Sequence, residues 1–581
     1  MSSSTSPARK SSLKDYSYDF VLATTQRSIN ATMKQYLDGL PQKPESTVLY
    51  ARDPTSQDKI KKTTPALITA EDLNKRIEAN FPGKFPSGLD PLSIPADTDG
   101  EDSRIRALRK VGFKYGFRIV AGIPDHYESK ADIPDLVTLG QDTSAVSYRM
   151  LCKDFDIVEL LTEDDDSFWN VYSQATQEKP WVFVAQVDMR MNAIGSNFAG
   201  LPDPVKNAVK NLDDNMFSIE QLVLDLSNTA LQKPATIEGL DTGGDLYEKV
   251  QRFFANQYCR GLAAQGKPVF NYTVKYKAQS STLIPTDLDF LVVPYVGDNG
   301  KALPNPTVNQ KQMSTLNYLC MTEQRSLPAS NKAFNWNWVA EDEASQLDGI
   351  ISINRNTFTE WFLRQIKPQA VSSCFKPKVN VTPGSWHPNF RYWREPITES
   401  DLTINKPSTG SRVLDISWSK QDEDGAGLDW ALGSLRYRNT YSATVDFQDS
   451  TIKVVVHGVI WAQLKVGQSW QTANVVDKTW TSEWSLGVDG SGKIVVKGEP
   501  VLQDNSENDS INGFSDFFTG ANSVFQEIRK NNIENVPFGP FPFRALGDFV
   551  FPGGRSFTFK NFRFSDNQDL LCAITYTDPT K

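Results

Sequence analysis

The stretch Thr451-Ile-Lys-Val-Val-Val-His-Gly-Val-Ile-Trp-Ala-Gln-Leu-Lys-Val466 decides the fold class. Apolar or small residues occupy every second position from Ile452 to Val466, which predicts a β-strand with one buried face. At about 3.3 Å per residue the strand spans roughly 50 Å, whereas ordinary strands have about 3–10 residues. This length favours an elongated, strongly twisted antiparallel sheet over a compact sandwich.

The same alternation recurs on both sides of this strand. It predicts further strands at residues 113–121, 146–152, 181–191, 441–447, 480–488, 555–564 and 570–576. A turn at Asp449-Ser450 joins the strand that ends at Phe447 to the long strand. In the strand at 555–564 the apolar phase shifts, which predicts a bulge near Lys560-Asn561.

Four segments show helical spacing instead. They are residues 19–37, with Leu22, Ile29 and Met33 on the apolar face; 246–262; 357–366, with Phe358, Phe362 and Ile366 on the apolar face; and 521–530. Pro368 is predicted to end the third helix. Each helix has one apolar face, so each must lie against a sheet. The fold class is therefore α+β.

The order helix, meander, helix and closing strands occurs twice along the chain. The first pass covers residues 15–345 and the second covers residues 346–581, so we expect two units of similar organisation. Residues 1–14 are rich in serine and carry Arg9, Lys10 and Lys14. We expect this segment to be a disordered tail.

Composition excludes several classes of protein. The 581 residues include 61 basic and 70 acidic ones, a net charge of −9, which argues against a nucleic-acid partner. The sequence has no apolar run near the roughly 18 residues of a membrane helix, and residues 1–14 lack the apolar core of a signal peptide. We expect a cytoplasmic protein, with non-classical export left open. Five cysteines without a CxxC pair and three scattered histidines predict neither a metal site nor a cofactor.

The motifs that suggest chemistry are weak. Residues 487–493, Gly-Val-Asp-Gly-Ser-Gly-Lys, match part of a phosphate-binding loop, but alternating strands on both sides favour a hairpin turn. His457 in the long strand and His387 in an aromatic loop are the candidate catalytic residues. A packed corner around His387 and a cross-strand partner for His457 are the more ordinary interpretations.

Three segments together resemble a known family. Residues 18–34, the stretch from Asp348 to Asn354, and residues 551–560 with 573–576 are similar to the forty-seven-kilodalton protein encoded beside botulinum neurotoxin genes and to its OrfX relatives. This chain is larger and has the basic, Ser-rich N-terminus, so a fungal relative with another role is kept as an alternative. The resemblance implies the tubular lipid-binding (TULIP) fold, in which long helices lie along highly curved antiparallel sheets. Each of the two expected units would then be TULIP-like.

Three functions follow as hypotheses. The first is a soluble protein that binds a lipid or other hydrophobic molecule in a groove lined by Leu22, Ile29, Met33, Phe358, Phe362 and Ile366. The second is a cyclase or isomerase of a hydrophobic secondary-metabolite substrate that uses the same cavity to orient it. The third is an accessory subunit of a toxin complex. Peripheral membrane contact and a protein partner are compatible with each hypothesis.

Overall fold

The computed structural model describes the greater part of the chain. Described are residues 6–38, 45–129, 131–140, 145–163, 166–194, 217–225, 236–243, 247–248, 250–251, 269–276, 285–385, 388–426, 433–489, 494–507, 521–530, 533–538, 549–550 and 557–576. Contacts divide the chain into two compact units. Unit 1 comprises Met1–Thr25, Met191–Gln221 and Asn271–Lys581, and unit 2 comprises Gln26–Arg190 and Leu222–Phe270. Antiparallel sheets dominate both units, which confirms the α+β class.

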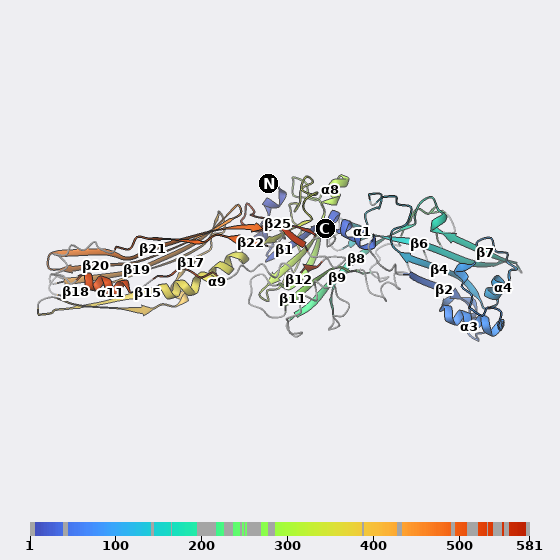
Figure 1. Cartoon of the computed structure of the whole chain (residues 1–581), viewed down its shortest axis with the longest axis horizontal. Coiled ribbons are helices and arrows are strands. Elements are labelled where there is room, and N and C mark those ends of the chain that lie inside the picture. Colours follow the sequence, from blue (N-terminus) through green and yellow to red (C-terminus); the bar gives the residue numbers. More distant parts are fainter. Residues whose placement is uncertain are drawn as a thin grey trace. The chain divides into compact units, whose positions relative to one another are not determined.

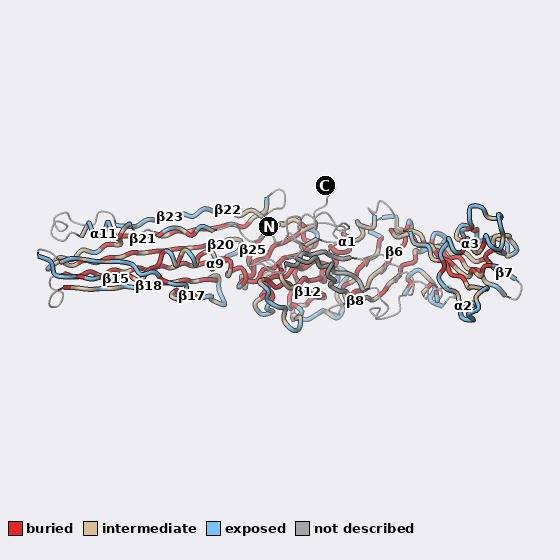
Figure 2. Tube along the Cα trace, turned by 90° about the horizontal axis from the view of Figure 1, so that it is seen from below, coloured by how far each residue is buried: buried red, intermediate tan, exposed pale blue. Residues whose placement is uncertain are grey.

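The predicted long strand belongs to a sheet of unit 1 that has long neighbours on both sides. The sheet runs in the order β17 (Thr403–Asn405), β18 (Arg412–Ala426), β19 (Gly433–Gln448), β20 (Thr451–Val466), β21 (Ser469–Val488) and β22 (Ile494–Lys497). Strand β23 (Pro500–Asp504) also pairs with β21. Buried residues alternate with more accessible ones along β19 and β20 (Figure 2). The hairpin predicted between 488 and 494 is confirmed, because Val488 pairs with Ile494.

A second sheet of unit 1 combines segments that are far apart in the sequence. Its order is β12 (Pro285–Val293), β13 (Thr315–Thr322), β1 (Phe20–Thr25), β14 (Gly349–Ile353), β26 (Leu570–Tyr576) and β25 (Phe557–Phe564). Strands β1, β13 and β14 are buried at every position, as expected for the centre of a sheet covered on both faces. The predicted bulge is confirmed by a register shift between Phe559 and Asn561.

Helix α9 (Arg355–Ser373) packs on β18 and β19 of the long sheet (Figure 1). Asn354 caps its first turn, because the Asn354 side chain accepts a hydrogen bond from the Asn356 N–H. The hairpin of β15 (Phe375–Thr382) and β16 (Asn389–Pro396) follows, with β15 against β18 and β19. Helix α11 (Ala521–Arg529) packs on β20 and β21. These elements cover one face of the long sheet.

Unit 2 contains one end of an 11-stranded antiparallel sheet. The order is β3 (Ala66–Ile68), β2 (Glu45–Ala51), β4 (Phe113–Ala121), β6 (Ala145–Glu163) and β8 (Val182–Ile194), and β5 (Val137–Leu139), β7 (Asp166–Ser173) and β10 (Thr236–Glu238) pair off this path. Helices α3 (Ala70–Asn80) and α4 (Ser103–Lys110) bury Leu73, Ile77, Ile105 and Leu108 in one core with Phe113. Unit 2 also contains the short helix α2 (Lys59–Thr63) and helix α1 (Gln26–Asp38).

The structure corrects the expected disordered tail. Residues 7–10 and 13–15 form short 3-10 helices, and Ala8 and Leu13 are fully buried. Arg9 pairs with Asp566 at 2.8 Å. The segment is ordered because its backbone and small side chains find partners near the C-terminus. Residues 1–5 lie outside the described residues.

Two helix boundaries also differ from the prediction. The segment 19–37 is a strand up to Thr25, and α1 begins only at Gln26. Helix α9 continues through Pro368 to Ser373, because the buried Ala370 and Ser373 hold the last turns in place. The predicted helix at 246–262 falls largely outside the described residues.

The compact units differ from the predicted division at residue 345. The six-stranded sheet places β1 and β13, from the first predicted half, beside β14 and β26, from the second. A boundary between the halves would cut through this sheet. The presence of a TULIP-like unit in each half stays a prediction.

Candidate hydrophobic binding layer

The inner face of the long sheet is mostly apolar. On β20 it carries Ile452, Val454, Val456, Gly458, Ile460, Ala462 and Leu464. On β19 the corresponding positions are also buried; they include the polar Asn439 and end in Phe447. This face and the helix above it form what we call the apolar layer, defined by Phe358, Phe362, Ile366, Phe447 and Trp484.

Helix α9 lays three predicted residues into this layer. Phe358, Phe362 and Ile366 are fully buried, at intervals of four residues that place them on one helix face. The ring centroids of Phe358 and Phe447 lie 5.3 Å apart, and those of Phe362 and Trp484 of β21 lie 6.4 Å apart. Offset and tilted aromatic pairs of this kind add to the free energy of apolar burial.

A short irregular segment, residues 533–538, closes the layer beside α9. The ring centroid of its Phe538 lies 6.0 Å from that of Phe362 and 4.8 Å from that of Trp484. Its Ile533 side chain sits against Gly458, where an added Cβ would come within 2.6 Å of Ile533 Cδ1. The segment therefore lies directly on the inner face of β20. We call it the cover segment.

One polar group inside the layer is left without a partner. Tyr441 of β19 is 2% exposed and pairs across the strands with Gly458, the position that Ile533 covers. Among the described residues no hydrogen-bond partner lies at its hydroxyl oxygen. Burial raises the pKa of Tyr441 above the ordinary value, and the nearby Cys374 raises it further. The hydroxyl is therefore neutral and available for a hydrogen bond.

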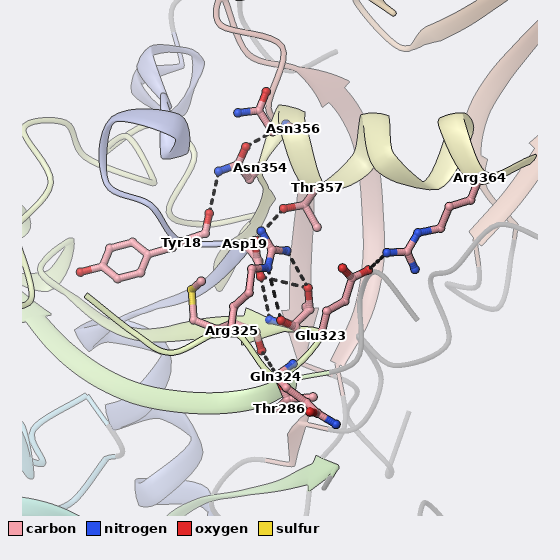
Figure 3. Close-up of polar contacts among 12 residues, drawn as sticks. Tyr18, Asp19, Thr286, Glu323, Gln324, Arg325, Asn354, Asn356, Thr357 and Arg364 are labelled. Carbon is pink, nitrogen blue, oxygen red and sulfur yellow. Dashed lines mark hydrogen bonds and ion pairs between the residues drawn. The ribbon is translucent and has the colours of Figure 1, made fainter. Parts of the chain in front are cut away.

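A buried carboxylate fixes the N-terminal end of α9 (Figure 3). Asp19 Oδ1 accepts hydrogen bonds from Thr357 Oγ1 at 2.8 Å and from the Arg325 guanidinium at 2.7 Å. Its Oδ2 accepts the Thr322 N–H at 2.7 Å. About two turns further along the helix, Arg364 pairs with Glu323 at 2.5 Å. Helix α9 is thus anchored to strand β13 of the six-stranded sheet.

A second buried carboxylate holds the same helix end. Asp569 accepts hydrogen bonds from the Arg355 N–H at 3.0 Å, the Leu13 N–H at 2.7 Å and the Ser11 hydroxyl at 2.9 Å. Burial raises the pKa of Asp569 to about 6, although these hydrogen bonds act in the opposite direction. Asp19 and Asp569 thus hold the N-terminal end of α9, and its later turns are held by the ion pairs of Arg364 and Lys367 together with the apolar layer.

The other predicted ligand-binding residues lie elsewhere. Leu22 belongs to β1, where it pairs with Tyr318 and Ile351 in the six-stranded sheet. Ile29 and Met33 belong to α1 of unit 2, and Met33 packs against a cluster that includes Ile133. The predicted single face of Leu22, Ile29 and Met33 is corrected, because the chain changes from strand to helix at residue 26.

The two candidate catalytic histidines gain no support. His457 lies on the outer face of β20, and its Nε2 is 3.0 Å from Asp477 Oδ1 of β21. That carboxylate also accepts a hydrogen bond from Asn474. His457 therefore has the cross-strand partner of the ordinary interpretation and cannot reach the apolar layer on the opposite face. His387 lies outside the described residues.

Two further kinds of feature are absent from the described residues. Within the described ranges, no three His, Cys, Asp or Glu side chains gather so that they could hold a metal ion. None of the described helices is long and apolar enough to cross a membrane.

Neither a family model nor a curated protein matches this sequence. Among solved structures, the fold is similar to P47 of Clostridium botulinum E1, at 11% identity and a TM-score of 0.44 over 96% of this chain and 98% of that one. It is also similar to P47 from Clostridium botulinum A2, at 10% identity and a TM-score of 0.40 over 96% and 97%. A lipopolysaccharide binding protein matches at 9% identity and a TM-score of 0.26 over 96% and 99%.

Two of these structural neighbours are P47 proteins, the family that the sequence resembles. The likenesses are distant in identity and in TM-score. Function is therefore inferred from this chain's own residues.

Sequence reasoning missed Tyr441, Phe447 and Phe538 as members of the layer. Tyr441 and Phe447 were placed on the apolar face of a strand, but alternation does not tell which buried residue has an unpartnered hydroxyl. Phe538 lies in a segment whose apolar residues follow neither helical nor strand spacing. No local signal identifies such a residue as a cover.

Proposed function

We propose that unit 1 binds an elongated hydrophobic molecule with one polar end, such as a lipid, in the apolar layer between α9 and the long sheet. The observation that carries the proposal is the Tyr441 hydroxyl, which is buried in this layer and has no hydrogen-bond partner among the described residues. An unsatisfied buried hydroxyl costs about 1–3 kcal/mol. A ligand that brought a carbonyl, hydroxyl or phosphate oxygen to Tyr441 would remove this cost.

The layer supplies the apolar part of the binding free energy. Each Å² of apolar surface that leaves water stabilises the complex by about 25 cal/mol, before the entropy of association is subtracted. The surface that leaves water is that of the ligand, because the aromatic side chains of α9 and Trp484 are already buried in the protein. The ligand would run beneath α9 and take the place of part of the cover segment.

The cover segment gives a route of entry. Phe538 is only half-buried, and Ile533 reaches the inner face through a gap that Gly458 leaves by lacking a side chain. Displacement of residues 533–538 would expose Gly458 and its cross-strand neighbour Tyr441 together. The anchors at Asp19 and Asp569 would hold the N-terminal end of α9 during this movement.

The test is native mass spectrometry of the purified protein, followed by denaturing extraction and lipid analysis. We expect an apolar adduct in about one-to-one ratio, either as purified or after incubation with a lipid extract. A bare protein mass under both conditions would exclude the proposal.

Two substitutions at adjacent positions locate the site. Val456 points into the layer and Val455 points to the outer face of the same strand. Val456→Phe fills the layer and should abolish the adduct, whereas Val455→Phe adds the same atoms outside and should retain it. Equal retention by both variants would place the ligand elsewhere. If Val456→Phe does not fold, Tyr441→Phe makes the same comparison with a smaller change.

A further inference from the structure

A pocket in unit 2 has a strongly positive lining in a chain whose net charge is −9. Its volume is about 300 Å³, and its lining includes Arg52, Lys62, Arg109 and Lys114 but no Asp or Glu. These side chains come from three different parts of the unit: the end of β2, helix α2, and helix α4 with the start of β4. The fold therefore brings four cations to one hollow.

The backbone fixes this arrangement. Gly112 has a φ of +81°, and a Cβ there would lie 2.6 Å from the Arg52 carbonyl oxygen. The Gly112 carbonyl accepts the Arg52 N–H at 2.7 Å, and the Arg76 guanidinium donates to the Arg52 carbonyl at 2.8 Å. Both main-chain groups of Arg52 are thus occupied. Glycine allows β4 to begin close beside the end of β2.

Among the described residues, Arg52 and Lys114 form no ion pair with a carboxylate. Arg52 Nε is shielded from solvent, and among the described residues it has no hydrogen-bond partner. Burial lowers the pKa of Lys114, the charge of Arg52 lowers it further, and Glu159 acts in the opposite direction. The Lys114 ammonium donates to the uncharged Thr162 hydroxyl at 2.8 Å. Arg109 reaches Ser167 at 3.0 Å and Glu101 only at 3.9 Å.

We infer that this pocket, the basic pocket of unit 2, is a binding site for a phosphate group, carried by a soluble phosphate ester or by a lipid headgroup. Guanidinium groups match the geometry of phosphate oxygens, and an ammonium adds a compact positive charge. Arg52 and Lys114 lie at the wall of the pocket, and Lys62 on α2 is exposed at its rim. A bound phosphate would accept hydrogen bonds from the guanidinium and ammonium groups that line the pocket.

Titration calorimetry with inorganic pyrophosphate tests the site in the full chain, at about 0.15 M salt so that distant charges are screened. We expect saturable binding, at least tenfold weaker in the double variant Arg52→Gln/Lys114→Gln. A wild-type protein that binds no pyrophosphate would overturn the proposal.

Helix α2 offers a matched pair of variants for the same titration. Lys62 lines the pocket, whereas its exposed neighbour Lys61 does not. Lys62→Gln should weaken binding several-fold, and Lys61→Gln should leave it within about twofold. Equal losses would overturn the proposal, because they would indicate a general attraction to positive charge. Both side chains are exposed, so neither variant depends on refolding a core.

Vesicles of phosphatidylcholine, with and without phosphatidic acid, separate the two sources of phosphate. Binding to the phosphatidic acid vesicles that pyrophosphate competes away and the double variant loses assigns the site to a lipid headgroup. Pyrophosphate binding without vesicle binding assigns it to a soluble ester. Vesicle binding that the double variant retains in full, together with pyrophosphate binding that it also retains, would overturn the pocket as the site.

Discussion

The Tyr441 hydroxyl supplies a prediction that separates stability from binding. In protein stripped of ligand, Tyr441→Phe removes an unpartnered buried group, so we expect the free energy of unfolding to rise by about 1 kcal/mol. Retention of the apolar adduct should fall several-fold, because the ligand loses its hydrogen bond. Urea denaturation and native mass spectrometry measure the two effects.

Tyr392 provides the control for this substitution. Its hydroxyl donates to Glu527 at 3.0 Å, outside the apolar layer. Tyr392→Phe should leave adduct retention unchanged and lower the stability slightly. A Tyr441→Phe protein that is clearly less stable without ligand would contradict the assignment of an unpartnered hydroxyl.

Asp569 predicts a particular pH dependence. Its pKa is about 6 in the folded protein, against an ordinary value of 3.8, because the carboxyl group is buried. The unfolded chain therefore loses this proton near pH 4, while the folded chain keeps it until about pH 6. The contribution of Asp569 to the free energy of unfolding is about 3 kcal/mol. It is fully present below pH 4 and is lost as the pH rises to 6.

Urea denaturation between pH 3.5 and pH 7 measures this contribution as a difference between two proteins. Asp569→Asn cannot titrate, so the difference in unfolding free energy between wild type and variant should change with pH between about 4 and 6 and be constant above about 7. A difference that is constant across the whole range would show that the carboxyl titrates normally.

At the scale of elements, helix α9 shows why a helix can continue past a proline. Pro368 lacks an N–H, so the Arg364 carbonyl cannot receive its usual helical hydrogen bond, and a proline in a helix interior costs about 3 kcal/mol relative to alanine. The Pro368 ring is exposed, so no packing depends on it. Pro368→Ala should therefore raise the free energy of unfolding by about 1–3 kcal/mol.

Thermal and urea denaturation check this expectation, with Lys367→Ala as the neighbouring control. Lys367 and Glu399 form a partly exposed ion pair. Replacement of Lys367 should therefore change the free energy of unfolding by less than about 1 kcal/mol. A destabilised Pro368→Ala protein would mean that the packing of Ala370 and Ser373 requires a bend at the proline.

The same helix shows how far the sequence predicts an element. Spacing identified Phe358, Phe362 and Ile366 as one buried face, because a period of 3.6 is a local property. The end of α9 depends on burial of Ala370, which is a tertiary contact and outweighs the local preference of Pro368. The start of α1 was misplaced for a similar reason, because β1 is stabilised by hydrogen bonds to β13 and β14.

At the scale of the whole chain, alternation predicted the long sheet but not the six-stranded one. Strands β18 to β21 follow one another through hairpins, so their pairing can be inferred from order alone. Strand β1 instead pairs with residues almost 300 positions away, such as Leu319 opposite Val21. The sequence of a strand that is buried on both faces does not indicate which other strands it pairs with. The expected boundary at 345 failed to follow the compact units for this reason.

The N-terminal segment contacts residues near the C-terminus of the chain. Deletion of residues 1–14 removes the buried Leu13 side chain and two hydrogen-bond donors to Asp569, the Ser11 hydroxyl and the Leu13 N–H. The loss of a buried apolar side chain costs about 2–5 kcal/mol, and each donor withdrawn from a buried carboxyl adds about 1–3 kcal/mol. We expect urea denaturation to show a destabilisation of several kcal/mol, whereas Lys10→Gln at an exposed position should have almost no effect. If the shortened protein unfolds with the same free energy as the full chain, the segment is the dispensable tail that its composition suggests, and the anchoring of α9 through Asp569 does not depend on it.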